Sequence, residues 1–124
     1  MKKVVVSKLP KTWIFDLDGI IVKHNGYKID GVDTLLPGVK ELMSNIGAED
    51  KVIIISARKS LYKEETLEFL KKNEIKYDLI MFDMPIGERI VINDEKPEGL
   101  QTAVAVNISR DKIDDVEIVI DDCL

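Results

Sequence analysis

The feature that most constrains the fold is a series of short apolar runs, several of which end in a polar residue. The most continuous run is Lys51–Ser56 (KVIIIS), and the runs Thr12–Phe15 (TWIF) and Asp78–Phe82 (DLIMF) precede and follow it. Because these runs lack polar alternation, they predict strands buried on both faces, as in the sheets of α/β proteins. Three later runs predict further strands: Arg89–Ile92, Thr102–Ile108 and Glu117–Ile120.

Two segments between the runs have helical periodicity. Gly38–Ile46 follows a proline, has apolar residues at helical spacing and is followed by Gly47, a suitable stop. Ser60–Asn73 carries leucines at helical spacing, with Ser60 as a candidate N-cap. Alternating strands and helices predict an α/β fold, a three-layer Rossmann-like sandwich with a central, mostly parallel sheet.

The second half of the chain departs from simple alternation. Only about six residues (DMPIGE) separate the third and fourth runs, whereas a parallel crossover normally takes a dozen or more. The EKPEGLQ link before the fifth run is equally short. Either the connection is unusually tight or one strand runs antiparallel, and we expect a mixed sheet with a parallel centre. The 124 residues suit a single domain, residues 1–124.

Composition limits the partners and the compartment. A net charge of −5 argues against nucleic-acid binding, which rests on clusters of Lys and Arg. The single cysteine, Cys123, cannot form an internal disulfide and favours a reducing compartment. No apolar run approaches the roughly 20 residues of a membrane span, and Val4–Val6 is too short for a signal peptide. We expect a cytoplasmic protein without nucleic-acid or membrane partners, and leave open whether it forms a homo-oligomer.

The strongest chemical signal is the pentapeptide FDLDG at Phe15–Gly19. Asp16 and Asp18 follow an apolar strand, and ligands of open α/β sheets bind outside the carboxyl ends of strands. Two carboxylates this close repel each other, a cost that a hard cation relieves. One can attack phosphorus while the other moves a proton, which phosphoryl transfer requires. The alternative interpretation is a solvated turn that happens to contain two aspartates.

FDLDG resembles the first motif of the haloacid dehalogenase-like hydrolases, whose usual form is DxDG followed by Thr or Ser. Ile20 stands at that following position here. The resemblance implies that Asp16 accepts the phosphoryl group and that Asp18 is the general acid and base. It also implies one Mg²⁺ held by the Asp16 carboxylate, the Asp18 backbone carbonyl and the Asp94 carboxylate.

The second motif of that family is an apolar strand ending in Ser or Thr, whose hydroxyl binds phosphoryl oxygens. KVIIIS is similar to it, which makes Ser56 the implied phosphate ligand, with Ala57 and Gly19 as further phosphate-binding positions. Arg58 follows closely and is expected to reach the phosphate or its leaving group. The alternative is that Ser56 only begins a helix and Arg58 is solvated.

The fourth family motif is an acidic metal ligand after another apolar strand. RIVINDEKP supplies Asp94, with Glu95 as a second candidate. Asp121 and Asp122 also follow an apolar run, but they lie at the extreme end of the chain and rank lower.

The third motif is a Lys or Arg that neutralises the phosphoryl charge, and no lysine follows DLIMF directly. Arg89 and Lys96 are the nearest candidates. A strand rises about 3.3 Å per residue, which would place Arg89 roughly 16 Å from the strand end that carries Asp94. We therefore favour Arg58 as the phosphate-side cation and expect a structural role for Arg89.

The resemblance covers residues 11–108. KHNGY, LLPGVKEL, GERIVINDEKP and QTAVAVNISRD are similar to small capless members encoded among bacterial surface-polysaccharide genes. A flap over residues 23–36, which contains His24, is the most that fits in place of a large cap. The resemblance implies a magnesium-dependent phosphatase that acts through an aspartyl-phosphate on a small phosphorylated substrate, such as a sugar phosphate.

Two other functions stay open. A non-catalytic hydrolase-like domain would bind a phosphorylated ligand or a partner protein. A receiver-like domain would use Asp83 as phospho-acceptor, because YDLIMFDMP resembles the acceptor strand of that family. The order of elements argues against the receiver, since a strand ending in Ser or Thr follows the acceptor there and precedes Asp83 here.

Overall fold

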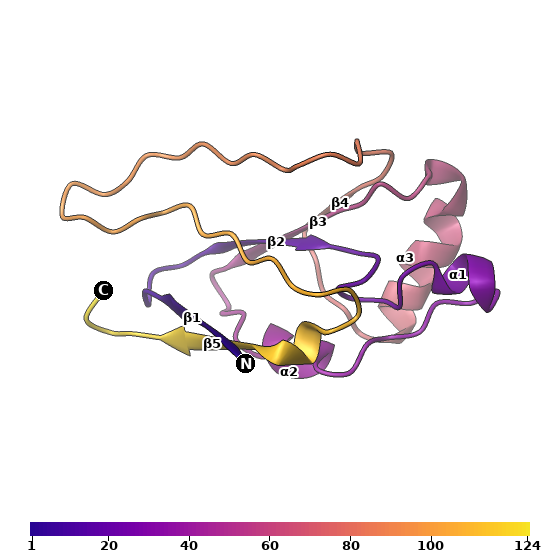
Figure 1. The fold of residues 1–124 in the computed structure, drawn as a ribbon, viewed down its shortest axis with the longest axis horizontal. Helices are drawn as coiled ribbons and strands as arrows, with labels where there is room; N and C mark the ends of the chain where they lie inside the picture. The colour runs from indigo at the N-terminus through magenta and orange to yellow at the C-terminus, as the bar shows by residue number, and fades with distance from the viewer.

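Five strands form two small parallel sheets in the computed structural model, which describes residues 1–124. One sheet has the order β2-β3-β4 and the other pairs β1 with β5 (Figure 1). The strands are β1 (Lys2–Val6), β2 (Thr12–Asp16), β3 (Lys51–Ile55), β4 (Leu79–Met81) and β5 (Val116–Ile120). All strand pairings in both sheets are parallel, which confirms an α/β fold with parallel sheets.

Short helices connect the strands. They are α1 (Gly26–Ile29), α2 (Val39–Met43) and α3 (Lys63–Lys72), with 3₁₀ turns η1 (Ser60–Tyr62) and η2 (Ile113–Asp115). α2 and α3 lie within the two predicted helical segments, whereas α1 and β1 were not predicted. Figure 1 shows α1 and α3 at one end of the molecule and α2 beneath the larger sheet, beside η2.

The hydrophobic core lies at β2 and β3 and the helices packed against them. Val52 and Ile54 of β3 are buried, together with Leu42 of α2 and Leu70 of α3. Complete burial of each such side chain contributes roughly 1.5–3 kcal/mol. Gly38, at the start of α2, has φ +91°, and a Cβ there would lie 2.8 Å from the Asp114 Cα. The glycine therefore permits both the turn and the close packing of α2 on η2.

Asp50 fixes the beginning of β2 against β3. Its carboxylate accepts hydrogen bonds from the Lys11 amide (2.9 Å), the Trp13 indole (2.8 Å) and the Gly47 amide (2.9 Å). Burial by itself raises the pKa of Asp50, but these hydrogen bonds outweigh it and leave that pKa below its usual value. The resulting register pairs Asp16 with Ile55, so that β2 and β3 end at the same level.

Residues 84–112 form an extended arm instead of the two further strands predicted at Arg89–Ile92 and Thr102–Ile108. The arm turns at its tip, where the Lys96 amide donates to the Leu100 carbonyl and the Gly99 amide to the Lys96 carbonyl, both at 2.8 Å. The few residues after β4 are too short for a parallel crossover, and the chain leaves the sheet instead. Those two predictions, and the mixed sheet that we expected from them, are therefore wrong.

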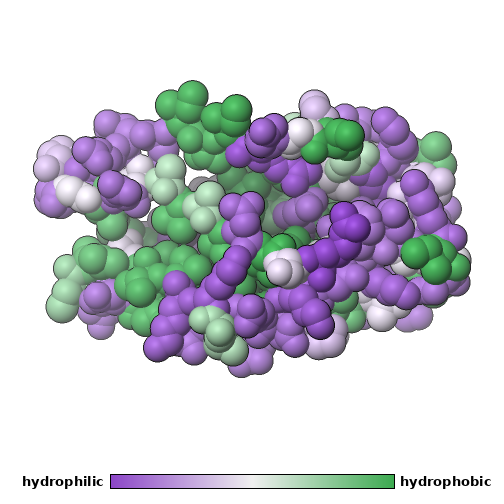
Figure 2. All heavy atoms as spheres, viewed as in Figure 1, coloured by the Kyte–Doolittle hydropathy of each residue, from purple (hydrophilic) through white to green (hydrophobic).

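The arm and the smaller sheet carry exposed apolar side chains. Figure 2 shows hydrophobic residues over the arm and around β1 and β5, and mainly hydrophilic residues over α1 and α3. Ile90 is 82% exposed and Ile92 is 93% exposed. No helix of the structure is both long enough and apolar enough to span a membrane.

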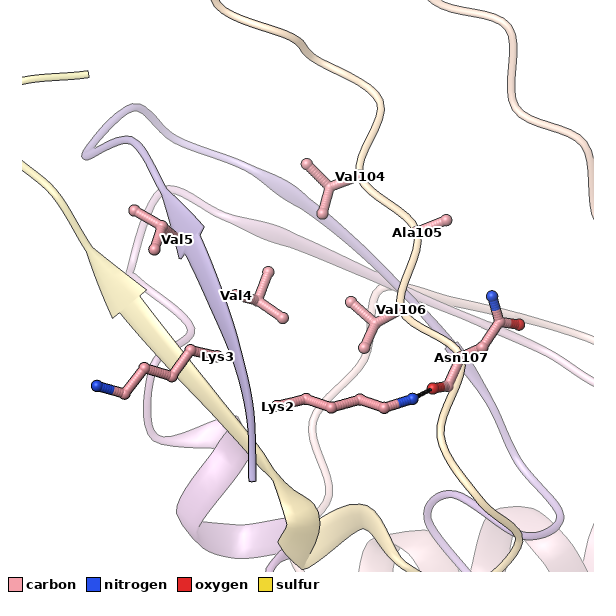
Figure 3. Close-up of a pocket in the computed structure, with 8 residues that line it drawn as sticks. All are labelled: Lys2, Lys3, Val4, Val5, Val104, Ala105, Val106 and Asn107. Carbon is pink, nitrogen blue, oxygen red and sulfur yellow. Dashed lines mark hydrogen bonds between the residues drawn. The ribbon is translucent and has the colours of Figure 1, made fainter.

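An open groove of about 590 Å³ separates β1 from the returning limb of the arm (Figure 3). The Lys2 ammonium crosses it and donates to the backbone carbonyl of Asn107. The lining residues are Lys2, Lys3, Val4, Val5, Val104, Ala105, Val106 and Asn107. None of them belongs to the predicted site, so the groove is separate from the chemistry considered below.

Candidate functional site

The carboxyl ends of the three strands of the larger sheet meet at one edge. Asp16 is the last residue of β2, and Ser56 follows the last residue of β3. The Ser56 amide donates to the Met81 carbonyl at 2.8 Å, which joins this point to the end of β4. The structure therefore brings Asp16 and Ser56 to the same edge, where ligands of α/β sheets bind.

The loop after β2 is fixed by a buried leucine and a glycine. Leu17 is fully buried between the two aspartates, and its amide donates to the Asp16 Oδ1 at 2.9 Å. Gly19 has φ +85°, and its amide donates to the Val22 carbonyl at 2.7 Å. This left-handed conformation favours glycine, which explains the Gly of DLDG in terms of a tight turn below the carboxylates.

Asp16 forms an ion pair with Arg89. The Arg89 Nη1 lies 3.3 Å from the Asp16 Oδ1, and the two side chains are 35% and 40% exposed. Arg89 reaches this position because it lies at the beginning of the arm and not within a strand. The distance calculated from strand geometry therefore does not apply, and Arg89 lies in contact with the predicted nucleophile.

The Arg58 side chain is completely buried behind Asp18. Its Nη2 lies 2.8 Å from the Asp18 Oδ1, and its Nε lies 3.4 Å from the Asp18 Oδ2. Asp33 binds Nη1 at 2.8 Å and Nη2 at 2.9 Å, and the Thr66 hydroxyl accepts from Nη1 at 2.9 Å. The guanidinium carbon lies 3.9 Å from the centre of the Tyr27 ring. All three guanidinium nitrogens have partners, contrary to our expectation that Arg58 binds the phosphate.

The charge of Arg58 is secure in this environment. Burial alone lowers the pKa of Arg58, but the hydrogen bonds and charges of Asp33 and Asp18 raise it above its usual value. Arg58 therefore acts on Asp18 as a permanent positive neighbour.

The Ser56 hydroxyl is also turned toward its own loop. Ser56 is buried, and its Oγ accepts a hydrogen bond from the Arg58 amide at 3.0 Å. The hydroxyl keeps its proton for donation to another group. Ala57, between these two residues, is half-buried.

Asp83 ties the loop after β4 to the loop after β3. Its amide donates to the Arg58 carbonyl at 2.9 Å, and its Oδ1 accepts from the Ser60 amide at 3.0 Å. The hydrogen bonds from Ser60 lower the pKa of Asp83 below its usual value. This side chain closes a loop and does not pair with Asp16 or Asp18, which argues against Asp83 as the acceptor of a receiver domain.

The flap over residues 23–36 packs beside the DLDG turn. The His24 amide donates to the Asp111 Oδ1 at 2.9 Å, and the Asp111 amide donates to the Gly19 carbonyl at 2.9 Å. Asp111 thus joins the base of the arm to both the flap and the turn. The His24 imidazole is half-buried and forms no hydrogen bond.

The magnesium ligands implied by the resemblance come from the DLDG turn and from the arm. Asp94 is exposed on the arm, five residues beyond Arg89, which on an extended chain corresponds to roughly 16 Å. Lys96 lies at the tip of the arm, and Asp121 and Asp122 follow β5 in the other sheet. No group of three or more His, Cys, Asp or Glu side chains is positioned to hold a metal ion. The set implied by the resemblance has only two carboxylates and one backbone carbonyl, so the magnesium site stays a prediction.

Four residues at the site were missed from the sequence: Tyr27, Asp33, Thr66 and Asp111. Thr66 had a usable signal, because it lies four residues before Leu70 and so shares the inward face of α3. The other three contact residues far away in the sequence, and no local spacing marks such contacts.

The comparisons with known proteins give one partial match. No family model and no curated protein matches this chain. A chain in the solved structure of the Pnkp1/Rnl/Hen1 complex matches with a TM-score of 0.51 and 33% sequence identity. The match covers 68% of this chain and 32% of that chain, so this chain spans about a third of the length of its match.

Proposed function

We propose that this chain is a phosphatase that transfers a phosphoryl group from a small phosphorylated substrate to Asp16. The observation that carries the proposal is the half-exposed Asp16 carboxylate at the carboxyl end of β2, with a half-exposed arginine in contact with it. Asp18, two residues on, is held from behind by the buried Arg58. A nucleophile, a proton carrier and a cation thus meet at one edge of a parallel sheet.

Each of these groups has a role in the proposed reaction. An Asp16 oxygen attacks phosphorus while the bond from phosphorus to the leaving oxygen breaks. Asp18 gives its proton to that leaving oxygen. In the second half, Asp18 takes a proton from water, whose oxygen attacks the aspartyl-phosphate and releases inorganic phosphate and the Asp16 carboxylate.

Arg89 is the cation that this reaction needs beside the phosphoryl group. Charge spreads over the equatorial oxygens during phosphoryl transfer, and the protein supplies mainly positive charge and positioning. The contact of Arg89 with Asp16 is 3.3 Å long and half-exposed, so the guanidinium can move onto a phosphate that arrives at Asp16. In the free protein the same contact balances the charge of the nucleophile.

The partial likeness to a chain of the Pnkp1/Rnl/Hen1 complex extends at most to a phosphoesterase-related domain. Membership of the haloacid dehalogenase-like hydrolases, a sugar phosphate as substrate and a cytoplasmic location are parts of our proposal that rest on the sequence. Magnesium enters it as a dependence to be measured, because no group of three or more His, Cys, Asp or Glu side chains marks a metal site in the structure. No step above is assigned to the metal.

A panel of phosphomonoesters tests the proposal directly. Wild type is assayed on p-nitrophenyl phosphate, sugar phosphates and nucleotides, with Mg²⁺ and with EDTA. We expect Asp16→Asn to lower turnover by at least about three orders of magnitude with an unchanged circular dichroism spectrum. Asp122→Asn, an exposed aspartate after β5, is the matched control and should keep full activity. Retained turnover in Asp16→Asn would exclude covalent catalysis at that carboxylate.

A non-catalytic binding domain remains the second candidate, because no metal-binding group is assembled and Asp16 is already paired. It predicts that wild type hydrolyses none of the panel but binds inorganic phosphate in calorimetry. Arg89→Gln should abolish that binding if the phosphate occupies the same edge of the sheet.

A further inference from the structure

Five side chains from four segments form a cluster around the buried Arg58 guanidinium that we call the clasp: Asp18, Tyr27, Asp33, Arg58 and Thr66. Tyr27 and Asp33 belong to the flap, Arg58 to the loop after β3 and Thr66 to α3. The Arg58 side chain is 0% exposed and that of Asp33 is 6% exposed. The clasp therefore connects the flap to Asp18 through the protein interior.

The clasp fixes the orientation of the guanidinium plane. Asp33 binds both terminal nitrogens, at 2.8 and 2.9 Å, which uses the forked geometry that only arginine offers. Tyr27 covers one face of the guanidinium, and Tyr62 packs edge-on against Tyr27 with ring centres 4.7 Å apart. Asp33 and Thr66 take both hydrogens of Nη1, and Asp33 takes one of Nη2. Arg58 therefore contacts Asp18 along its Nε and Nη2 edge.

The two oxygens of Asp18 are held differently along that edge. The contact of Oδ1 with Nη2 is 2.8 Å long, whereas that of Oδ2 with Nε is 3.4 Å, near the limit for a hydrogen bond. The Asp18 side chain is 18% exposed, so one part of it still reaches solvent. Oδ1 therefore anchors the carboxylate, and Oδ2 is the less tightly held oxygen.

We infer that Asp33 is a positioning residue that acts through Arg58 to aim Asp18 Oδ2 at the leaving oxygen of the substrate. The inference rests on the proposed function and adds to it that the flap sets the proton-transfer group. The affected step is the breaking of the bond from phosphorus to the leaving oxygen. There the phosphoryl group passes to Asp16, and the Asp18 proton passes to the leaving oxygen, which departs as an alcohol or phenol.

Leaving-group dependence separates positioning from mere folding. p-Nitrophenolate leaves without help from an acid, whereas phenolate needs a proton as the bond breaks. We expect Asp33→Asn to lower kcat/KM for phenyl phosphate by about 100-fold and for p-nitrophenyl phosphate by less than about tenfold. A purely structural role would lower both rates by the same factor. The control is Asp30→Asn, an exposed aspartate of the same flap that pairs with Lys23, and it should change neither rate.

The outcomes distinguish the two levels of the proposal. A wild type that hydrolyses neither ester overturns the proposed function and this inference with it. An active wild type with equal losses on both esters in Asp33→Asn overturns the inference alone. If Asp33→Asn does not fold, Thr66→Val decides: it removes one acceptor of Arg58 at nearly constant volume and should shift the ratio of the two rates in the same direction. An unchanged ratio in Thr66→Val then overturns the inference.

Discussion

Two arginine–aspartate pairs stand at the end of β2, one inside the protein and one at its surface. Arg58 and Asp18 lie in the clasp with the arginine fully buried, whereas Arg89 and Asp16 meet at 3.3 Å with both side chains partly exposed. The inner pair has further side-chain partners in Asp33 and Thr66, whereas the outer pair has only the Leu17 amide, which donates to Asp16. One arginine is built to stay in place, and the other is free to exchange its partner for a ligand.

The difference follows from solvation. A buried charge has lost its water, so that removing its partner leaves an uncompensated charge in the interior. A half-exposed pair keeps part of its hydration and contributes little to the free energy of folding. The same two residue types thus stabilise the fold at one site and leave a reactive group available at the other.

The largest expected effect comes from breaking the inner pair. Arg58→Met removes the only cation between Asp18 and Asp33, and we expect the free energy of unfolding to fall by about 3–5 kcal/mol. Urea unfolding followed by circular dichroism measures it, with Arg89→Met as the matched variant at the outer pair. A loss below about 1 kcal/mol in Arg58→Met would show that water reaches the clasp and that the two pairs do not differ as described.

A smaller effect, and on turnover alone, is expected at the outer pair. Arg89→Gln should lower kcat by about 100-fold, in line with the loss of one preorganised group that stabilises transition-state charge. The free energy of unfolding should change by no more than about 0.5 kcal/mol. Arg89→Lys keeps the charge and should recover part of the rate. If Arg89→Gln retains full activity, the phosphoryl charge is neutralised by another group and the outer pair is not part of the site.

The strands of the larger sheet could be predicted from the sequence, whereas the contacts of the clasp could not. β2, β3 and β4 follow from apolar runs whose burial is a local property, and Asp16 follows from its place after such a run. The partners of Arg58 depend on packing between segments, since Asp33 lies 25 residues away and no periodicity connects the two positions. The short segment Ala57–Lys59 after β3 is equally typical of a solvated turn, so the burial of Arg58 could not be predicted from the sequence.

The prediction of two strands within the arm was wrong because the local sequence pattern there is that of a strand, although no sheet partner is available. RIVI and TAVAVNI have the apolar, β-branched composition of buried strands, but neither pairs with either sheet. The short connection after β4 correctly indicated that the next segment could not form another parallel strand of the same sheet. We resolved it with an antiparallel strand, whereas the chain instead leaves the sheet and delivers Arg89 to Asp16 at the point of departure.

The smallest expected effect tests this account of the arm. Ile90 and Ile92 are 82% and 93% exposed, so their side chains bury little area and Ile→Thr at both positions should change the free energy of unfolding by about 0.5 kcal/mol or less. Ile54→Thr in β3 is the matched control: this side chain is fully buried in the core, and introducing a hydroxyl there should cost several times more. The measurement is again urea unfolding. A loss of about 2 kcal/mol or more in the arm variant would mean that these isoleucines pack in a core, as a buried strand at Arg89–Ile92 requires. That result would also move Arg89 away from Asp16, since a strand beginning at that residue would start roughly 16 Å from the catalytic end. The proposed role of Arg89 therefore requires that these two isoleucines are exposed.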